Sequence, residues 1–272
     1  MKNPPIPKRR IDIDHILIEK GKRGYYSPKQ GGHSHNFYEL FYITHGKCRF
    51  LLKDNLYELT PGDLVFIAPG ELHHNIFQDQ ETCEMIMIYF KKEYVDIEFS
   101  NIHSFMGSVP SIYRDEFEFS LNRMLSENSM QDEYAEGFRQ CHLKAILLLL
   151  MRHSVLNEKD PDILNSKDAD ILLATKYIYK NFKQPLTLEE VSAVASLSPT
   201  YFSKKFKQIV GMGFKEYLNF VRLKHAQAAL LTTNHTITDI ALEYGFNDSN
   251  YFKDLFKKVY GRSPREFRKN PD

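Results

Sequence analysis

The stretch from Thr236 to Arg268, TITDIALEYGFNDSNYFKDLFKKVYGRSPREFR, predicts a short helix, a glycine turn and a second helix. Thr236 and Asp239 have the spacing of a capping box, and the apolar residues that follow share one helical face. Gly245 can adopt the left-handed backbone of a sharp turn, and Asp248 is placed to cap the second helix. The apolar stripe of that helix is Phe252, Leu255, Phe256 and Val259. This spacing predicts one buried face and one polar face.

Two short helices with a tight turn and a polar outer face are typical of a helix-turn-helix, whose second helix enters the major groove of DNA. An ordinary helical hairpin with solvated lysines has the same local pattern. Taken alone, the stretch therefore leaves both interpretations open.

A second copy of the pattern favours the helix-turn-helix. Residues 187–211, TLEEVSAVASLSPTYFSKKFKQIVG, again begin with a capping-box pair, Thr187 and Glu190, and Ser198 precedes Pro199 at the start of a new helix. Three positions recur fifty residues apart: Phe202, Phe206 and Gly211 against Phe252, Phe256 and Gly261. The turn of the second copy is one residue longer. An internal repeat of one supersecondary unit is hard to explain as a chance hairpin.

With these motifs the C-terminal region resembles the DNA-binding region of the AraC/XylS family of bacterial transcription regulators. The matching runs are YFSKKF (201–206), RLKHAQAALL (222–231), ITDIALEYGF (237–246), YFKDLFKK (251–258) and GRSPREFR (261–268). Two positions depart from the family pattern. Ser196 stands where the first turn usually has glycine, and Asp254 stands where a basic residue is common.

The resemblance implies double-stranded DNA as a partner and gives two sets of DNA-facing residues. They are Thr200, Ser203, Lys204 and Lys207 in the first unit and Ser249, Asn250, Lys253 and Asp254 in the second. Asn can bind adenine, Lys can reach guanine and Asp can accept from cytosine, whereas Lys and Ser can also contact phosphate alone. The helix predicted over residues 214–231 is about 27 Å long, which suits recognition helices in successive major grooves about 34 Å apart.

Charge is distributed unevenly along the 272 residues, a length that suits two domains. The formal net charge is +1, but residues 170–272 hold sixteen Lys and Arg against ten Asp and Glu. A basic C-terminal part beside an acidic N-terminal part fits phosphate binding at one end only. Solvated charged faces are common, so this signal only supports the motifs.

The N-terminal part predicts many short strands separated by turns, over about residues 11–97. The clearest segments are FYELFYITHGKCRFLL (37–52), NLYELTPGDLVFIAPG (55–70) and CEMIMIYF (83–90). Strands of this length and spacing predict a small β-barrel.

Within this part, the spacing of four residues resembles the two motifs of the cupin barrel: His33, His35, Glu39 and His73. In metal-binding cupins the matched residues bind the ion, and three imidazoles with one carboxylate suit a first-row metal. The alternative is a pocket for a small effector, in which nearby tyrosines add stacking and hydrogen-bonding groups. We favour this second interpretation, with no metal or other cofactor. The predicted pocket comprises His33, His35, Tyr38, Glu39, Tyr42 and His73.

Residues 114–156 predict helices, of which the second has apolar residues on more than one face. One side would cover the barrel, and the other would contact a second subunit or be buried in the same monomer. The polar, proline-broken stretch 157–168 predicts an interdomain linker. The expected fold is therefore two-domain α+β: a cupin-like barrel with following helices (1–160), then an all-α DNA-binding domain (165–272) with helix-turn-helix units at 187–211 and 236–261.

Three further features bear on location. The N-terminal MKNPPIPKRR has no apolar segment after its basic residues, which predicts no secretory signal and a cytoplasmic protein. The longest apolar run, 145–151, is too short to cross a bilayer, so no membrane partner is expected. The cysteines, Cys48, Cys83 and Cys141, are odd in number and scattered, which indicates reduced thiols.

Together these features predict a transcription regulator that responds to a small effector such as a sugar and is not an enzyme. The resemblance implies a homodimer, and contact with RNA polymerase if the protein is an activator. Two alternatives stay open. One is a metal-dependent cupin enzyme, which leaves the C-terminal repeat unexplained, and the other is a dimeric DNA-binding protein without an effector.

Overall fold

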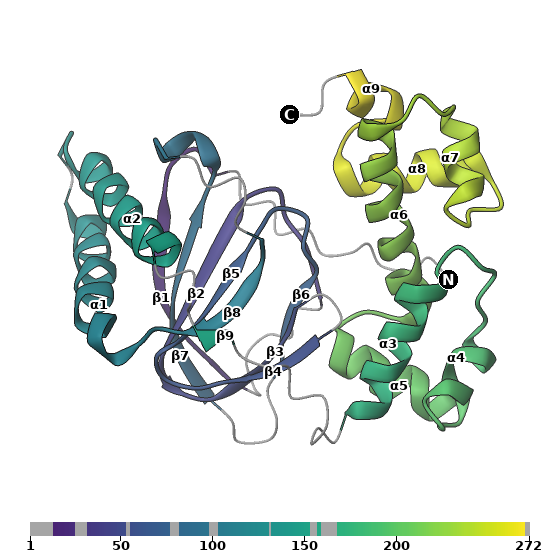
Figure 1. Ribbon diagram of the computed structural model, residues 1–272, viewed down its shortest axis with the longest axis horizontal. Coiled ribbons are helices and arrows are strands. Elements are labelled where there is room, and N and C mark those ends of the chain that lie inside the picture. Colours follow the sequence, from purple (N-terminus) through teal and green to yellow (C-terminus); the bar gives the residue numbers. More distant parts are fainter. Residues whose placement is uncertain are drawn as a thin grey trace. The chain divides into compact units, whose positions relative to one another are not determined.

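The computed structural model describes residues 13–24, 32–52, 55–76, 82–97, 103–130, 132–152, 157–158 and 168–269. These residues divide into two compact units, one up to residue 158 and one from residue 168 onward (Figure 1). The predicted boundary between residues 160 and 165, and the strand expected from residue 11, begin outside the described residues. Within the described part, no helix combines the length and the apolar character that a membrane span requires.

The N-terminal unit is built on two antiparallel sheets. The larger has the order β1 (Leu17–Gly24), β7 (Thr82–Phe90), β2 (Tyr38–Gly46), β5 (Asp63–Ile67), β8 (Phe105–Ser108) and β9 (Asn157–Glu158). The smaller has the order β4 (Asn55–Leu59), β3 (Cys48–Leu52) and β6 (His73–Ile76). Turn residues at positive φ, among them Gly46 at 74° and Gly62 at 91°, separate successive strands. Two facing sheets of this kind belong to the double-sheet β architectures.

Side chains on the larger sheet alternate between two cores, because successive residues of a strand point to opposite faces. On β2, Phe41 and Ile43 face the smaller sheet, where they pack with Phe50 and Leu52 of β3. The intervening Leu40 and Tyr42 join the core on the opposite face. The same alternation along β5 and β7 buries apolar side chains on both faces of the sheet.

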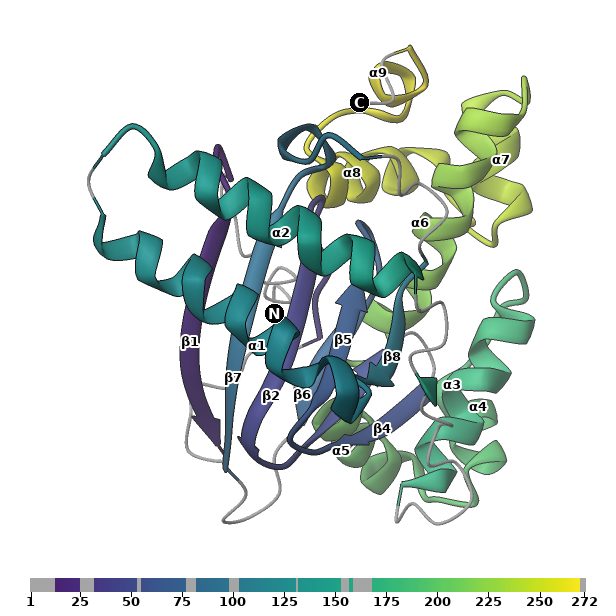
Figure 2. The same cartoon turned by 60° about the vertical axis from the view of Figure 1, so that its left-hand side comes forward.

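Two helices cover that opposite face, α1 (Ser111–Ser126) and α2 (Ala135–Arg152), as Figure 2 shows. Their inward residues are Phe117, Leu121, Met124, Leu143, Ile146, Leu147 and Leu150. Short 3-10 turns lie at Lys92–Tyr94 and Glu127–Ser129. On the outer side Phe119, Phe138 and Leu148 remain 60%, 48% and 46% exposed within the single chain.

The C-terminal unit consists of helices alone over the residues described. In order these are α3 (Ala169–Asn181), α4 (Leu188–Val194), α5 (Pro199–Val210), α6 (Phe214–Thr232), α7 (Ile237–Glu243), α8 (Ser249–Tyr260) and α9 (Pro264–Lys269). Figure 1 shows α6 running between the group α3–α5 and the group α7–α9. The helices α4 to α8 lie where the sequence predicted them, whereas α9 was not predicted, and the predicted two-domain α+β fold class is confirmed.

One prediction needs correction. The first two residues of the predicted linker 157–168 are not linker: Asn157 and Glu158 pair with Ser108 and Gly107 at the edge of the larger sheet. An edge strand pairs through backbone N–H and C=O groups, so polar side chains do not exclude it. Asp168, the last residue of the predicted linker, is not linker either, because it is the N-cap of α3, while residues 159–167 lie outside the described residues. The three cysteines are free, as predicted.

Candidate functional site

The first helix-turn-helix, α4 and α5, is shaped by caps that its sequence supplies. The Thr187 hydroxyl accepts from the backbone N–H of Glu190 (3.1 Å), and Ser198 caps α5 from the residue before Pro199. Ser196 adopts a left-handed backbone in the turn, with φ 55°. Gly211 ends α5 in the same conformation, with φ 79°. These four features fix where each helix begins and ends.

The second unit, α7 and α8, repeats this construction. The Thr236 hydroxyl accepts from the backbone N–H of Asp239 (3.1 Å), and the Asp248 carboxylate accepts from the backbone N–H of Asn250 (2.8 Å). Gly245 supplies the left-handed turn with φ 85°, and Gly261 ends α8 with φ 80°. The connection from α7 to α8 has one residue more than that from α4 to α5, as the sequence predicted.

The second helix of each unit buries a pair of phenylalanines and turns a polar face outward. Phe202 and Phe206 of α5, like Phe252 and Phe256 of α8, are fully buried. Of the predicted DNA-facing residues, Thr200, Ser203, Lys204, Lys207, Asn250 and Asp254 are exposed, and Ser249 and Lys253 are half-buried. The structure thus places each set on one helix and away from its core.

Two details of this polar face were not predicted. The Lys253 Nζ donates to Asn250 Oδ1 at 3.4 Å, which leaves the Asn250 amide NH2 available to a base. Tyr201 and Tyr251, fifty residues apart, are both about half exposed beside the predicted residues. Aromatic residues in a helix usually belong to the core, so the sequence does not single these two out, although the repeat places both just outside the phenylalanine stripe.

Lys205 shows why sequence neighbours on α5 differ in role. Its Nζ lies 2.8 Å from Asp170 Oδ1 and 3.5 Å from Asp168 Oδ1, at the start of α3. Burial opposes the charge of Lys205, but the two carboxylates outweigh it and raise the pKa of Lys205. This lysine stabilises the helical packing, while Lys204 beside it is free to face a ligand.

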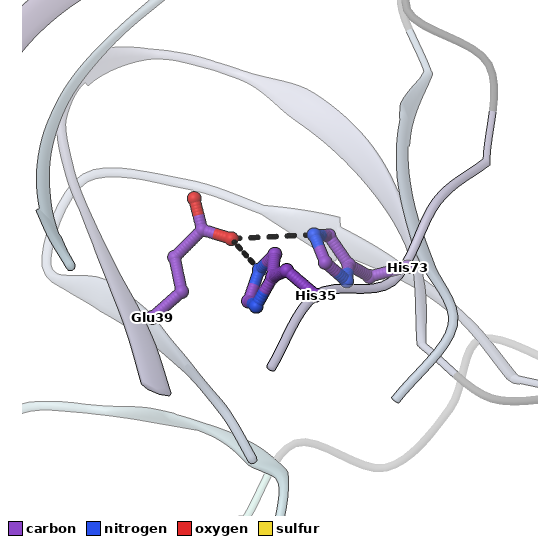
Figure 3. Close-up of side chains that lie close together, drawn as sticks. All are labelled: His35, Glu39 and His73. Carbon is purple, nitrogen blue, oxygen red and sulfur yellow. Dashed lines mark hydrogen bonds and ion pairs between the residues drawn. The ribbon is translucent and has the colours of Figure 1, made fainter. Parts of the chain in front are cut away.

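In the N-terminal unit the structure brings together three of the predicted pocket residues, drawn in Figure 3. His35 Nε2 lies 2.7 Å and His73 Nε2 lies 3.2 Å from the same carboxylate oxygen of Glu39. The side chains of His35, Glu39 and His73 are 4%, 3% and 1% exposed. The His33 ring lies 4.3 Å from the His73 ring, and the backbones of the two residues are paired. We call His33, His35, Glu39 and His73 the histidine cluster.

Backbone carbonyls orient the two inner imidazoles through their Nδ1 atoms. His35 Nδ1 contacts the Phe37 carbonyl (2.9 Å) and His73 Nδ1 contacts the Glu71 carbonyl (3.0 Å). Because a carbonyl only accepts, both Nδ1 atoms carry a proton, and both Nε2 atoms face Glu39. His73 Nε2 is buried and is not aligned for a hydrogen bond, despite its 3.2 Å distance from the carboxylate.

The charge of Glu39 is stabilised by these neighbours. Burial alone would raise the pKa of this carboxyl, but its contacts with His35 and His73 outweigh burial and hold the pKa far below its ordinary value. An ionised Glu39 therefore faces two imidazole nitrogens in a nearly dry site. One carboxylate oxygen and two imidazole nitrogens, all within 4.8 Å of one another, are also a donor set that fits a first-row metal ion.

The structure does not bring Tyr38 and Tyr42 to this cluster, and the predicted six-residue pocket is wrong in that respect. Both tyrosines lie on the face of β2 opposite Glu39, because side chains alternate along a strand. Tyr38 packs on Phe66 and Phe90. The buried Tyr42 donates to Glu118 Oε1 of α1 at 2.5 Å, and burial together with this bond raises the pKa of the Tyr42 hydroxyl.

Comparisons with known proteins give one matching family model in each of the two compact units. Residues 13–145 match the model of the AraC-like ligand binding domain, and residues 191–270 match that of a helix-turn-helix domain. The HTH-type transcriptional activator RhaR of Escherichia coli is 26% identical over 87% of this chain and 86% of its own length. An uncharacterized HTH-type transcriptional regulator of Staphylococcus aureus is 28% identical over 84% of this chain.

The chain spans only 31% of the length of that staphylococcal relative. Among solved structures, the C-terminal domain of AraT, a response regulator from Geobacillus stearothermophilus, is 38% identical over 37% of this chain and 84% of that chain, with a TM-score of 0.36. The two family models match in order, each on one of the two units described above. The chain belongs to the AraC family of helix-turn-helix transcription regulators.

Proposed function

We propose that the protein binds DNA sequence-specifically through both helix-turn-helix units and regulates transcription in the cytoplasm in response to a small effector. The observation that carries this proposal is the duplicated unit with a buried phenylalanine pair and an outward polar face on each second helix. A packing hairpin needs no such face in both copies. The polar residues also have the chemistry of base readout, since Asn pairs with adenine and Lys with guanine.

The spacing between the units supports two successive contacts on one side of DNA. The connecting helix α6 has 19 residues. At about 1.5 Å per residue it spans about 28 Å, close to the rise of one turn of B-DNA, about 34 Å. We propose that α5 and α8 enter adjacent major grooves.

Binding-site selection from random DNA with the full chain tests this proposal. We expect an enriched sequence with two separated elements, bound with an affinity that falls steeply as salt rises, because lysines release counterions from phosphate. Recovery of no enriched sequence by a folded protein at low salt would contradict the proposal.

For the effector, we propose that the histidine cluster binds a small polar molecule. His73 Nε2 supports this because it is buried without an aligned partner, which leaves a polar atom for a ligand to satisfy. The case for a sugar in particular depended on Tyr38 and Tyr42, which lie on the other face of β2. A sugar or related metabolite remains one member of the proposed class.

A thermal-shift screen of sugars and other polar metabolites tests the effector proposal, because a ligand that binds only the folded state raises its stability. We expect the active compound to lose its effect in Glu39→Gln and to keep it in Glu118→Gln, which changes a carboxylate on the opposite face of the sheet. Equal shifts in both variants would place the effector elsewhere.

The second candidate is a metal ion in the histidine cluster, with or without enzymatic activity, and the 4.8 Å grouping of ligand atoms favours it. An ion would take the place of the proton between His35 Nε2 and Glu39, so its binding would weaken at low pH. Elemental analysis of protein purified without chelator decides between the two. We expect little metal. Near-equimolar iron, manganese, nickel or zinc that is lost in Glu39→Gln would favour the metal.

We also propose a homodimer formed through the outer face of α1 and α2, and contact with RNA polymerase if the regulator is an activator. The exposed Phe119, Phe138 and Leu148 support the dimer, because apolar groups gathered on one face mark interaction surfaces. Sedimentation analysis should give a dimer that Leu148→Glu dissociates. Leu242→Glu, the same change at an exposed leucine of α7, should leave it intact.

A further inference from the structure

The segment after α3, Phe182–Gln184, is a point where the two halves of the C-terminal unit touch apart from their shared helix α6. We define the first half as α3–α5 and the second half as α7–α9 (Figure 1). Lys183 of this segment pairs with Glu243 at the end of α7, with 3.0 Å between Nζ and Oε1. The same ammonium group lies 4.6 Å from the centroid of the Tyr244 ring. The segment therefore reaches the turn of the second helix-turn-helix.

Arg222 of α6 holds this segment by its backbone. Its Nε donates to the Phe182 carbonyl (2.8 Å) and its Nη2 donates to the Gln184 carbonyl (2.7 Å). Phe182 is the C-cap of α3 and Gln184 lies two residues beyond it, so a guanidinium that donates to both carbonyls holds the chain where it leaves α3. Arg222 is 9% exposed, and its guanidinium lies 5.9 Å from the centroid of the Phe246 ring.

Gly245 shows how closely the second turn approaches. A Cβ at this position would lie 2.9 Å from the Lys183 carbonyl oxygen and 2.9 Å from Arg222 Nε. No side chain fits there, so the turn is seated directly on the segment and on the arginine that holds it. Phe182 adds to the contact by stacking on His225 of α6, with ring centroids 4.3 Å apart.

We infer that Arg222 is a positioning residue that locks the two helix-turn-helix units at one spacing and rotation, and so sets the distance between the two DNA elements the protein accepts. This inference rests on the proposed DNA binding. A single helix such as α6 can bend and twist, and α6 alone would let the second half swing relative to the first. A second contact away from the helix axis removes that freedom.

Arg268 offers a matched control. On α9 it donates from Nε to the Leu230 carbonyl (3.2 Å) and from Nη2 to the His235 carbonyl (2.7 Å), at the end of α6. Like Arg222, it donates to one carbonyl at the end of a helix and to one a few residues beyond. Its contacts, however, lie between α9, the end of α6 and the residues before α7, and do not reach the first half. Loss of Arg268 should cost stability without freeing one half from the other.

The first measurement needs no DNA. In the full chain, Cys141→Ser removes the exposed cysteine. Gln208→Cys and Lys258→Cys then place spin labels at exposed positions fifty residues apart on α5 and α8. We expect one narrow distance distribution, a clearly broader one in Arg222→Met, and the original width in Arg268→Met. Arg222→Lys, which keeps the charge and can reach one carbonyl, should fold and be intermediate.

The second measurement uses the selected DNA with its two elements moved apart by one base pair. The parent protein should lose at least about tenfold in affinity, the size of a single mismatch. Arg222→Met should discriminate less than Arg268→Met does between the two spacings. Unchanged distance widths in Arg222→Met, or equal broadening in Arg268→Met, would overturn the inference. If the distance distributions have the expected widths but the parent protein binds no DNA, the proposed function is overturned. The role of Arg222 in holding the two halves together is then still supported.

Discussion

The two helix-turn-helix units form the same kind of left-handed turn with different residues. Ser196 in the first and Gly245 in the second both have a left-handed backbone, with φ 55° and 85°. Ser196 is exposed, so its side chain has room, whereas Gly245 lies against Arg222 and the Lys183 carbonyl. Glycine can meet two requirements at such a turn, left-handed backbone conformation and close approach of a neighbour, and in this protein only the second turn needs both.

The largest effect should follow from filling the second turn. Gly245→Ala adds a Cβ in the left-handed region, which costs about 1–2 kcal/mol, and overpacks a contact at a further cost of about 1–3 kcal/mol. We expect a loss of about 3 kcal/mol in the free energy of unfolding of the C-terminal unit, measured by urea denaturation of the full chain.

Gly213→Ala is the control for this change. Gly213 begins α6 with an ordinary φ of −72°, and a Cβ there would have no neighbour within 4 Å. It should cost no more than about 1 kcal/mol, because glycine is favoured over alanine at a helix N-cap. A Gly245→Ala protein as stable as Gly213→Ala would show that the second turn is not tightly seated.

Removing the N-cap of either second helix should cost less stability than filling the second turn. Asp248 accepts from the Asn250 N–H at 2.8 Å, while Ser198 accepts from the Tyr201 N–H at 3.4 Å. Removing a well-made N-cap costs about 1 kcal/mol, so we expect about that loss for Asp248→Ala and a smaller one for Ser198→Ala. Urea unfolding of both variants checks the order, and the reverse order would contradict these cap geometries.

The smallest effect is expected at the first turn. Ser196→Gly removes left-handed strain of about 1 kcal/mol, but the added freedom of the unfolded chain offsets it by about 0.4–1 kcal/mol. The unfolding free energy should therefore change by less than about 0.5 kcal/mol. A substantial gain in stability would mean that Ser196 is strained by more than its backbone angle.

The helical unit could be predicted closely from sequence because its signals are local. Each of these signals depends on a few neighbouring residues: helix caps such as Thr236, turn residues and the phenylalanine stripe. Because the unit occurs twice, the sequence shows each signal twice. The role of Arg222 could not be predicted in this way. Its partners, the carbonyls of Phe182 and Gln184, belong to the backbone forty residues earlier, where no side chain reveals them.

The candidate ligand site was only partly predictable. The motif spacing grouped His33, His35, Glu39 and His73 correctly: Glu39 and His73 lie at the starts of β2 and β6, and the segment before β2 that holds His33 and His35 pairs with His73. Tyr38 was grouped with them because it is next to Glu39 in sequence, although alternation along β2 sends the two to opposite faces. The near-complete burial of the cluster depends on both sheets closing over it, and short motifs do not report that packing.

The claim that two surfaces read two DNA elements is tested most directly by binding-site selection with Lys204→Ala and Asn250→Ala beside the unchanged protein. Each residue stands on a different second helix, so each variant should lose base preference in one element only. The expected cost at that element is about 1–3 kcal/mol. Lys180→Ala, an exposed lysine of α3 outside both units, should keep the full preference. Unchanged preferences in both folded variants would contradict the account.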